Sequence, residues 1–397
     1  MTRTRVIGKS RGGLVVLAAG GTGGHVFPAL AVADALHERG YETLLFTDKR
    51  GAKMMPDISG DKITRDEMSG HTDIHVISAA SPFQGNPLRR MVAVAKIGAG
   101  MMAAGISMIR RRPIAMIGFG GYPSFGPMAA AKILAVPMTL HEQNGFLGRA
   151  NRALARLAGR LALSWADTAN LPDNVDTKLV GMPVRPAFFT IAAAKAAQKT
   201  DIIELLIIGG SQGAAIFASL IPAAIAKMDG SLRDRMSITQ QCRAEQQDEI
   251  RAAYAALGIK AEIATFFTDM PDRLAKSHLV ITRSGASSVA EVAAAGRAAV
   301  MIPLPGAMDD HQTMNANQLV TAGGGIILPQ GTVAADDLAD NLAAEISALL
   351  ATPSLVAKMG QKAQSLARPN AAAAIPDYAL YFIREAGQPH CCKGGTA

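Results

Sequence analysis

The stretch GGTGGH, residues 20–25, holds residues suited to chemistry on a phosphorylated ligand. It follows the apolar run LVVLAA and precedes an alanine-rich stretch, so we expect it to join a buried strand to a helix. A glycine-rich turn at such a place exposes backbone N–H groups beside the positive pole of the helix, where a diphosphate can bind. His25 ends the turn, and its neutral imidazole could accept a proton as a general base. The alternative is a tight turn without a ligand, in which His25 makes only a local hydrogen bond.

A second glycine-rich turn, GGSQGA at residues 209–214, follows the apolar run ELLII about half the chain further on. Neither turn has the G-x-G-x-x-G spacing of a dinucleotide-binding site, in which Asp48 would be the acid that binds the ribose. Two similar turns in two similar halves instead predict one cleft between two domains. Each wall of that cleft would supply one loop.

Short apolar strands alternate with longer alanine-rich helices on either side of these turns. We expect strands at 14–19, 43–47, 74–79, 115–119 and 138–142, and at 204–209, 236–240, 263–267, 279–283 and 299–304. This βαβ pattern predicts parallel sheets covered by helices. The 397 residues are enough for two domains. The predicted fold class is therefore α/β, with two Rossmann-like domains whose parallel sheets face a central cleft, and a boundary within 181–201.

The formal net charge of +8 favours an anionic partner, such as a phosphorylated ligand or an acidic membrane surface. Aromatic residues make up 5% of the chain, which does not suit a nucleic-acid stacking surface, so we expect no nucleic-acid partner. Three cysteines, Cys242, Cys391 and Cys392, form no disulfide framework and no C-x-x-C metal pair. This usage favours a reducing cytoplasm.

The apolar segment at residues 91–109 is long enough to span a bilayer, but its glycines and small side chains make it weakly hydrophobic. The arginines at 89–90 and 110–112 flank it symmetrically and give no preferred orientation. We expect a packed helix whose ends touch an anionic membrane surface, together with Pro82, Phe83, Leu88 and Met91. A helix packed entirely inside the protein is the alternative.

Seven motifs resemble, in the same order, those of the MurG family of glycosyltransferases. They are GGTGGHVFPALA at 20–31, GFGGYPSFGP at 118–127, HEQN at 141–144, GMPVR at 181–185, GGSQGA at 209–214, RSGASSVAE at 283–291 and DDHQTMNA at 309–316. The resemblance covers about residues 13–385 and implies the GT-B architecture. It implies an N-terminal domain at 1–183 on the lipid and membrane side, a UDP-N-acetylglucosamine-binding domain at 184–368, and a C-terminal helix and tail at 369–397.

The resemblance also implies an activity. This is inverting transfer of N-acetylglucosamine from its UDP donor to the 4-hydroxyl of undecaprenyl-pyrophosphoryl-MurNAc-pentapeptide (lipid I), giving lipid II for peptidoglycan synthesis and cell division. The implied location is peripheral, on the anionic cytoplasmic face of the cell inner membrane. No D-x-D triplet occurs, so we expect no metal and no cofactor. Helix N-termini and cationic side chains would then stabilise the departing UDP.

Motif matching assigns Glu291 to the ribose hydroxyls, although Glu291 and Ser288 also have the spacing of a helix capping box. Gln312 is assigned to the sugar hydroxyls, but it could lie on a solvated helix face. Arg185, assigned to the diphosphate, could be an ordinary linker charge. The remaining donor contacts are assigned to Ser211, Ser284, Gly285 and the backbone of Phe267, with Thr22, Gly23, Gly24 and Asn144 completing the site from the N-terminal domain.

His25 is the candidate catalytic base, with Glu142 and His141 as rivals, and we expect Glu142 to position the acceptor. Two other functions compete with transfer. A UDP-sugar epimerase of the same architecture would act without a lipid acceptor. A non-catalytic protein that binds nucleotide and membrane would retain nucleotide binding but transfer no sugar.

Overall fold

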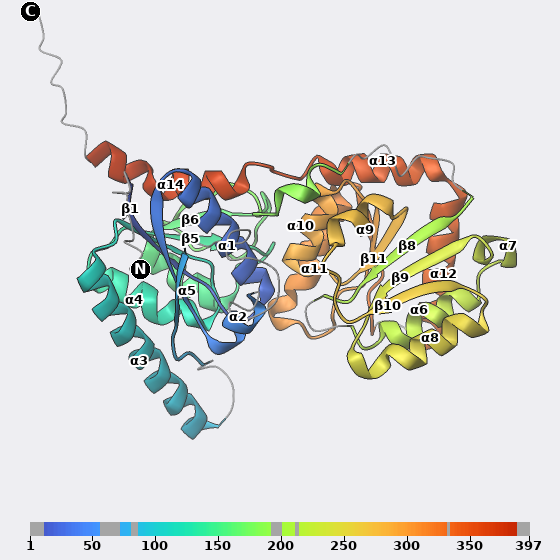
Figure 1. Ribbon diagram of the computed structural model, residues 1–397, viewed down its shortest axis with the longest axis horizontal. Coiled ribbons are helices and arrows are strands. Elements are labelled where there is room, and N and C mark those ends of the chain that lie inside the picture. The colour runs from blue at the N-terminus through green and yellow to red at the C-terminus, as the bar shows by residue number, and fades with distance from the viewer. Residues whose placement is uncertain are drawn as a thin grey trace, which may run out of the picture.

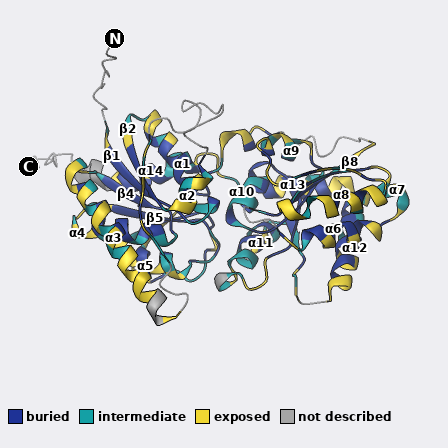
Figure 2. Ribbon diagram, turned by 60° about the horizontal axis from the view of Figure 1, so that its bottom comes forward, coloured by how far each residue is buried: buried dark blue, intermediate teal, exposed yellow. Residues whose placement is uncertain are grey.

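The computed structural model describes residues 12–55, 72–80, 86–191, 201–210, 214–331 and 334–386. These residues form two α/β domains that lie side by side, each built on one parallel sheet with helices around it (Figure 1). The predicted fold class is confirmed. The central strands of both sheets are buried, whereas edge strands and the outer faces of the covering helices are exposed (Figure 2).

The N-terminal domain contains a seven-stranded sheet in the order β3-β2-β1-β4-β5-β6-β7. Its strands are β1 Gly12–Ala18, β2 Tyr41–Thr47, β3 Thr72–Val76, β4 Ala115–Gly118, β5 Met138–Glu142, β6 Arg160–Leu163 and β7 Asp176–Leu179. Its helices are α1 Gly23–Glu38, α2 Lys49–Met54, α3 Pro87–Arg111, α4 Phe125–Ile133 and α5 Arg149–Ala158, with the 3-10 turn η1 Tyr122–Ser124. The sequence pattern missed β6 and β7, because each has four residues and the β7 edge strand is largely exposed.

The C-terminal domain contains a six-stranded sheet in the order β10-β9-β8-β11-β12-β13. Its strands are β8 Ile203–Ile208, β9 Met236–Gln241, β10 Lys260–Ala264, β11 Leu279–Thr282, β12 Ala299–Met301 and β13 Gly325–Ile327. Its helices are α6 Phe217–Ala226, α7 Gly230–Arg233, α8 Gln247–Ala256, α9 Met270–Lys276, α10 Ala286–Ala294, α11 His311–Thr321, α12 Ala335–Ala351 and α13 Pro353–Gln364. The strand predicted at 263–267 lies earlier, at β10, and the three-residue β13 was missed.

The last helix, α14 Ala371–Ala386, packs on the N-terminal domain rather than on the domain that precedes it in sequence (Figure 1). Arg39, the C-cap residue of α1, forms an ion pair with Asp377 of α14 at 2.7 Å. The Tyr378 hydroxyl donates a hydrogen bond to the Asp176 carbonyl at 2.9 Å. The chain therefore crosses between the domains twice. The helix expected near the C-terminus is present, while the domain boundaries at 183/184 and 368/369 stay predictions.

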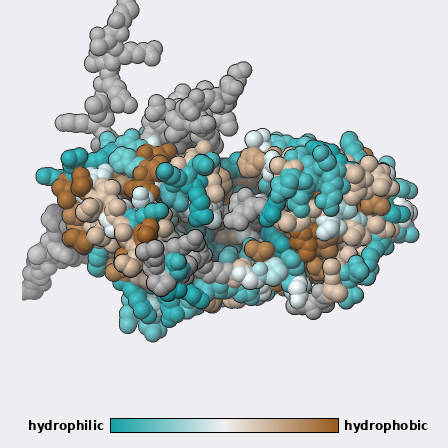
Figure 3. Space-filling view, turned by 90° about the horizontal axis from the view of Figure 1, so that it is seen from below, coloured by the Kyte–Doolittle hydropathy of each residue, from teal (hydrophilic) through white to brown (hydrophobic). Residues whose placement is uncertain are grey.

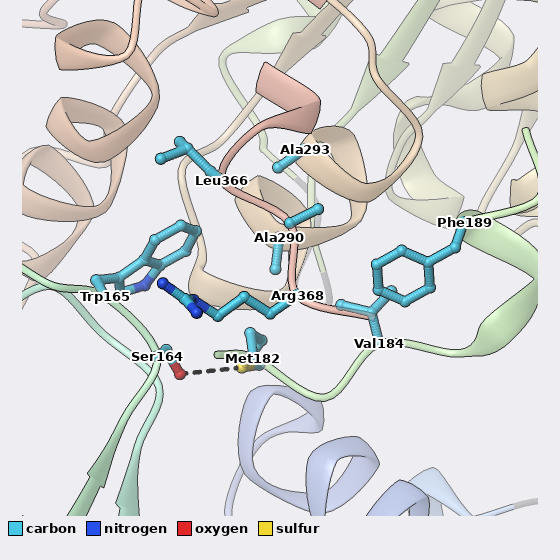
Figure 4. A pocket seen from close by; sticks show the side chains of 10 residues that line it. Ser164, Trp165, Met182, Val184, Phe189, Ala290, Ala293, Leu366 and Arg368 are labelled. Carbon is cyan, nitrogen blue, oxygen red and sulfur yellow. Dashed lines mark hydrogen bonds between the residues drawn. The ribbon is translucent and has the colours of Figure 1, made fainter. Parts of the chain in front are cut away.

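The two crossings meet at a small pocket lined by side chains from both of them. The side chain of Arg368, on the returning crossing, extends toward Trp165 beside Ser164 and Met182 (Figure 4). Gly181, on the outgoing crossing, has a φ of +95°, and a Cβ there would lie 2.6 Å from the Cβ of Arg368. A change in the angle between the domains must therefore reshape this contact.

Candidate active site

The N-termini of two helices, one from each domain, approach each other across the cleft. Thr22 is the N-cap residue of α1, and Gly23 and Gly24 are its first two residues. A Cβ placed on Gly24 would lie 3.6 Å from the Ser287 hydroxyl oxygen in the first turn of α10. Because both helix N-termini carry partial positive charge, this junction favours an anionic group between the domains.

Asp48 anchors the first glycine-rich turn to the end of the second strand. Its Oδ1 atom accepts hydrogen bonds from the Gly21 amide at 3.0 Å and from the Gly51 amide at 2.9 Å. The carboxylate thus caps α2 and holds the turn at the same time. This arrangement differs from that of a ribose-binding acid, the role that the dinucleotide-binding alternative required.

The motif GFGGYPSFGP, residues 118–127, packs directly against the glycine-rich turn at residues 20–25. Gly121 has φ +76° and ψ 162°, a backbone conformation nearly restricted to glycine. A Cβ at Gly121 would lie 2.7 Å from the Gly20 carbonyl oxygen. The Ser124 hydroxyl donates to the Ala18 carbonyl at 2.9 Å, which fastens this segment to the end of β1.

His25 lies in the first turn of α1 with its Nδ1 atom 3.1 Å from the Thr22 hydroxyl oxygen. Burial lowers the pKa of His25 to about 4, a backbone hydrogen bond at Gly20 opposes that shift, and His311 of α11 adds to it. Asp48 acts in the opposite sense and favours the protonated form. The imidazole is therefore neutral near pH 7 and able to accept a proton.

Glu142, at the end of β5, is 1% exposed and has both carboxylate oxygens engaged. Oε1 accepts from the Asn144 amide at 2.8 Å and from its side chain at 3.0 Å, while Oε2 accepts from Asn151 at 2.7 Å. Burial raises the pKa of Glu142, and these hydrogen bonds oppose the rise. The geometry favours a positioning role for Glu142, which orients Asn144 toward the other domain.

His141 is fully buried and contacts the crossing between the domains. Its Nε2 atom lies 3.1 Å from the Gly181 carbonyl oxygen and 3.2 Å from the Ser164 hydroxyl, and its Nδ1 atom lies 3.1 Å from the side-chain nitrogen of Gln143. Burial lowers the pKa of His141 to about 4. With both ring nitrogens engaged, His141 is placed to support the crossing segment rather than to accept a proton from a substrate.

Asn315, which motif matching did not single out, joins the two domains. Its Oδ1 atom accepts from the Gly145 amide at 2.8 Å, and its Nδ2 atom donates to Asn144 Oδ1 at 3.1 Å and to the Ser284 carbonyl at 3.0 Å. Asn315 is fully buried. A buried amide requires hydrogen-bond partners, and here two of the partners lie in the other domain, so no spacing within the motif marked Asn315.

Glu291 and Arg185 lie within electrostatic reach of each other. Burial raises the pKa of Glu291 to about 7, and the positive charge of Arg185 opposes the rise. The capping-box alternative for Glu291 is wrong, because α10 has Gly285 at its N-cap and Glu291 lies further along the helix. Arg185 itself is exposed, with its guanidinium 5.0 Å from the centre of the Phe188 ring.

The other predicted donor contacts surround the start of α10. The Ser284 and Ser287 hydroxyl oxygens are buried and have no hydrogen-bond partner within the described residues. Gln312 accepts a hydrogen bond from the Leu304 amide at 3.0 Å. Phe267 is 6% exposed beneath the guanidinium of Arg273, 3.9 Å from its ring centre. Ser211 lies outside the described residues, as do Pro82, Phe83 and the C-terminal cysteines.

Arg283 is a buried cation that the motif comparison also left without a role. Its Nη1 atom donates to the carbonyls of Ile302 and Pro303 at 2.8 and 2.9 Å, and its Nη2 atom donates to Gln330 at 2.8 Å. It thereby fixes the loop after β12 beside the start of α10. Within the described part of the chain, no three His, Cys, Asp or Glu side chains are grouped as a metal site. Metal independence stays a prediction.

Two Rossmann-like domains with opposed helix N-termini define a GT-B glycosyltransferase architecture. The chain belongs to glycosyltransferase family 28: residues 15–163 match the family's N-terminal domain and residues 204–375 match its C-terminal domain. The resemblance to the MurG family is confirmed, and the chain is a glycosyltransferase.

Two relatives carry the name UDP-N-acetylglucosamine--N-acetylmuramyl-(pentapeptide) pyrophosphoryl-undecaprenol N-acetylglucosamine transferase. The chain is 45% identical to the one from Granulibacter bethesdensis in an alignment of 368 residues, and the match covers 91% of this chain and 92% of the relative. It is 42% identical to the one from Paramagnetospirillum magneticum, over 93% of this chain and 97% of the relative.

Solved structures show the same architecture. The crystal structure of Acinetobacter baumannii MurG has a TM-score of 0.73 and 29% identity, and the match covers 93% of this chain and 99% of that one. A UDP-GlcNAc 2-epimerase from Neisseria meningitidis, bound to UDP-GlcNAc, has a TM-score of 0.63 and 13% identity, with 93% and 100% covered. The likeness to the epimerase shows the fold alone.

Proposed function

We propose that this chain transfers N-acetylglucosamine from UDP-N-acetylglucosamine to the 4-hydroxyl of undecaprenyl-pyrophosphoryl-MurNAc-pentapeptide, converting lipid I to lipid II. The observation that carries the proposal is the approach of the α1 and α10 N-termini, with His25 in the first turn of α1. The activity for which the relatives at 45% and 42% identity are named supports the choice of both substrates.

In this mechanism His25 accepts the proton of the acceptor 4-hydroxyl while that oxygen attacks the anomeric carbon of the donor. One carbon–oxygen bond forms to the acceptor as the bond to the UDP phosphate oxygen breaks, so a single displacement inverts the anomeric carbon. The Thr22 hydroxyl, 3.1 Å from Nδ1, orients the imidazole. A neutral imidazole is the protonation state that a general base requires.

The C-terminal domain would hold the donor and stabilise the charge that develops on UDP. The amides at the start of α10 and the guanidinium of Arg185 supply positive potential, while the Ser284 and Ser287 hydroxyls offer unused hydrogen-bonding capacity. Glu291, ionised in the complex, would accept hydrogen bonds from the ribose hydroxyls. No resident metal or cofactor enters this scheme.

A transfer assay with labelled donor and a short-chain lipid acceptor tests the proposal. We expect His25→Ala to lower kcat by roughly two to four orders of magnitude with both substrates saturating. His75→Ala, at an exposed histidine on β3, is the matched control and should leave kcat unchanged. Near-normal turnover in His25→Ala would remove the base from the mechanism. Conversion of UDP-N-acetylglucosamine without acceptor would instead identify an epimerase.

We further propose that the N-terminal domain binds the anionic cytoplasmic surface of the inner membrane through α3. The residues of α3 from Arg90 to Arg111 form a helix long and apolar enough to cross a membrane. One side of it packs on α4, because Ala93, Ala104 and Met108 are buried. The opposite side exposes Met91, Val92, Val94, Met102, Ile106 and Ile109.

This packing supports a helix that lies on the membrane rather than one that spans it. In Figure 1, α3 lies at the lower edge of the N-terminal domain. Figure 3 shows the molecule from below, and this domain has hydrophobic patches among hydrophilic ones there. Arg152 and Arg156 of the nearby α5 share one helix face with Arg149 and line a shallow surface depression. Cationic side chains beside exposed apolar ones suit a membrane that carries anionic lipids.

Vesicle sedimentation tests the membrane proposal. We expect wild-type protein to bind vesicles of phosphatidylglycerol and phosphatidylethanolamine, and added salt to weaken that binding. Changing both Arg89 and Arg90 to Glu should reduce the bound fraction severalfold. The double variant Lys260→Glu and Lys358→Glu, which alters two exposed lysines of the C-terminal domain by the same total charge, should bind as the wild type does. Equal binding by both double variants would contradict the assignment to α3.

A further inference from the structure

Asp48 lies beside the glycine-rich turn but has no role in the transfer mechanism proposed above. Its side chain is 13% exposed and lies where β2 ends and α2 begins. One oxygen accepts both the Gly21 and Gly51 amides, and the other lies 3.7 Å from Nε of the exposed Arg50. The carboxylate therefore accepts a hydrogen bond from the glycine-rich turn. Its negative charge is only weakly balanced by Arg50, because that cation is exposed to solvent.

The glycines around Asp48 make this close approach possible. A Cβ at Gly20 would lie 2.8 Å from Asp48 Oδ1, and a Cβ at Gly51 would lie 3.3 Å from the Gly20 Cα. Side chains at either position would push α2 away from the turn. The start of α2 is thus built to present a carboxylate to the backbone of the turn that ends at His25.

The charged and titratable groups around His25 come from three elements of the fold. Asp48, before α2, is the acidic one and favours the imidazolium, whereas His311 at the start of α11 disfavours it. His141 on β5 also interacts electrostatically with His25, and Arg50 of α2 lies beside Asp48. Burial opposes a positive charge on His25, and the negative charge of Asp48 acts against that effect without outweighing it.

We propose that Asp48 is a positioning residue for the transfer step: it anchors the glycine-rich turn through Gly21 and stabilises the positive charge that His25 acquires when it takes the acceptor proton. Asp48 does not touch the substrates and accepts no proton itself. The inference rests on the proposed role of His25 as the base. Its anchoring part can be measured without any turnover.

Two substitutions separate the two effects. Asp48→Asn retains a side-chain oxygen that can accept from Gly21 and Gly51 but loses the charge, whereas Asp48→Ala loses both. Asp73→Asn is the matched control, since Asp73 is an exposed carboxylate on β3 paired with Arg111 in the same domain. For each full-length variant we would measure kcat against pH, KM for both substrates, and hydrogen exchange at the Gly21 amide.

We expect Asp48→Asn to keep the Gly21 amide protected, to lower kcat about tenfold and to leave KM for UDP-N-acetylglucosamine within twofold of wild type. The acid limb of its kcat profile should move to lower pH, because His25 becomes a weaker base without the carboxylate. Asp48→Ala should in addition lose protection at Gly21. Asp73→Asn should match the wild type in all three measurements.

Wild-type kcat and an unshifted acid limb in Asp48→Asn would overturn the electrostatic part of the inference. Retained protection of Gly21 in folded Asp48→Ala would overturn the anchoring part, and if that variant fails to fold, an unprotected Gly21 amide in the wild type would do the same. A wild-type protein that transfers no sugar would instead contradict the proposed function. Hydrogen exchange at Gly21 would still test the anchor in that case.

Discussion

Asn315 of the C-terminal domain donates a hydrogen bond to Asn144 of the N-terminal domain across 3.1 Å. The same amide donates to the Ser284 carbonyl at 3.0 Å, and Asn144 in turn donates to Glu142. A continuous set of hydrogen bonds therefore connects a buried carboxylate of the N-terminal domain to the loop that begins α10. Through this connection the position of one domain depends on that of the other.

Replacing Asn315 with Ala should weaken domain closure. The change leaves the Gly145 amide and the Ser284 carbonyl without their partner, a cost of about 1–3 kcal/mol for each buried group that finds no water. We expect kcat to fall by at least tenfold, and spin labels placed on the two domains to report a wider spread of distances. Asn317→Ala, at an exposed position of the same helix, is the control. Unchanged distances would show that Asn315 does not hold the domains together.

The affinity for UDP-N-acetylglucosamine should increase with pH. The pKa of Glu291 is raised to about 7 by burial, so about a tenth of the carboxyl is ionised at pH 6 and about nine tenths at pH 8. If the ribose hydroxyls need the ionised form, the donor should bind about tenfold more tightly at pH 8. Calorimetric titration checks this, and Glu291→Gln should give weaker binding that is independent of pH over this range.

The same pKa predicts how Glu291 affects the stability of the ligand-free protein. A raised pKa means that folding favours the neutral carboxyl, so its contribution is complete below about pH 4.5 and is lost as the pH rises through 7. Relative to Glu291→Gln, the free energy of unfolding of the wild type should therefore decline over that interval. Urea denaturation at several pH values measures the difference. A parallel pH dependence in the two proteins would mean that Glu291 titrates normally.

The architecture could be predicted from the sequence because its strands and glycine-rich turns are local patterns. Alternation of apolar strands with helices predicted both sheets, although the short or exposed strands β6, β7 and β13 carry too little pattern to detect. The helix near the C-terminus was also predicted. Its return to the N-terminal domain was not, because the contact of Asp377 with Arg39 joins residues far apart in the chain.

In the candidate site, too, local motifs could be predicted from the sequence, whereas contacts between distant residues could not. His25, Glu142 and Glu291 could be chosen because they lie in motifs with recognisable spacing. Asn315 lies inside one of those motifs, yet its function depends on a partner in the other domain, which no local spacing reveals. Asp48 could be read as a ribose-binding acid until its hydrogen bonds to Gly21 and Gly51 were known. Pairings across the fold, rather than residue types, were the missing information.

Acidification should destabilise the protein partly through His141. Folding lowers the pKa of this buried histidine to about 4, so its contribution is complete above about pH 6.5 and is lost as the pH falls toward 4. A difference of roughly 2.5 pKa units corresponds to about 3 kcal/mol. His141→Gln should lose stability at pH 7 but depend less on pH between 6.5 and 4, whereas His75→Gln, on the exposed part of β3, should behave as the wild type does. Guanidinium unfolding at each pH measures the free energy of unfolding. If His141 titrated normally, this free energy would depend on pH in the same way in His141→Gln and in the wild type.

Gly121→Ala should displace the glycine-rich turn at residues 20–25, against which Gly121 packs. The backbone of Gly121, with φ +76° and ψ 162°, costs about 1–3 kcal/mol for a residue that carries a Cβ. That Cβ would also lie 2.7 Å from the Gly20 carbonyl, so the turn before His25 must shift. We expect a melting temperature several degrees lower. We also expect kcat to fall more than the affinity for UDP, because the turn belongs to the N-terminal domain, whereas the C-terminal domain is proposed to hold UDP.

Gly98→Ala is the control for this substitution. It places the same methyl group in the interior of α3, where no atom lies within 4 Å, and should keep or slightly raise the melting temperature because alanine favours a helix. Differential scanning calorimetry and the transfer assay on both variants decide the matter. If Gly121→Ala melts and turns over like Gly98→Ala, the backbone at residue 121 adapts without moving the turn, and the packing of the two glycine motifs does not fix the position of His25.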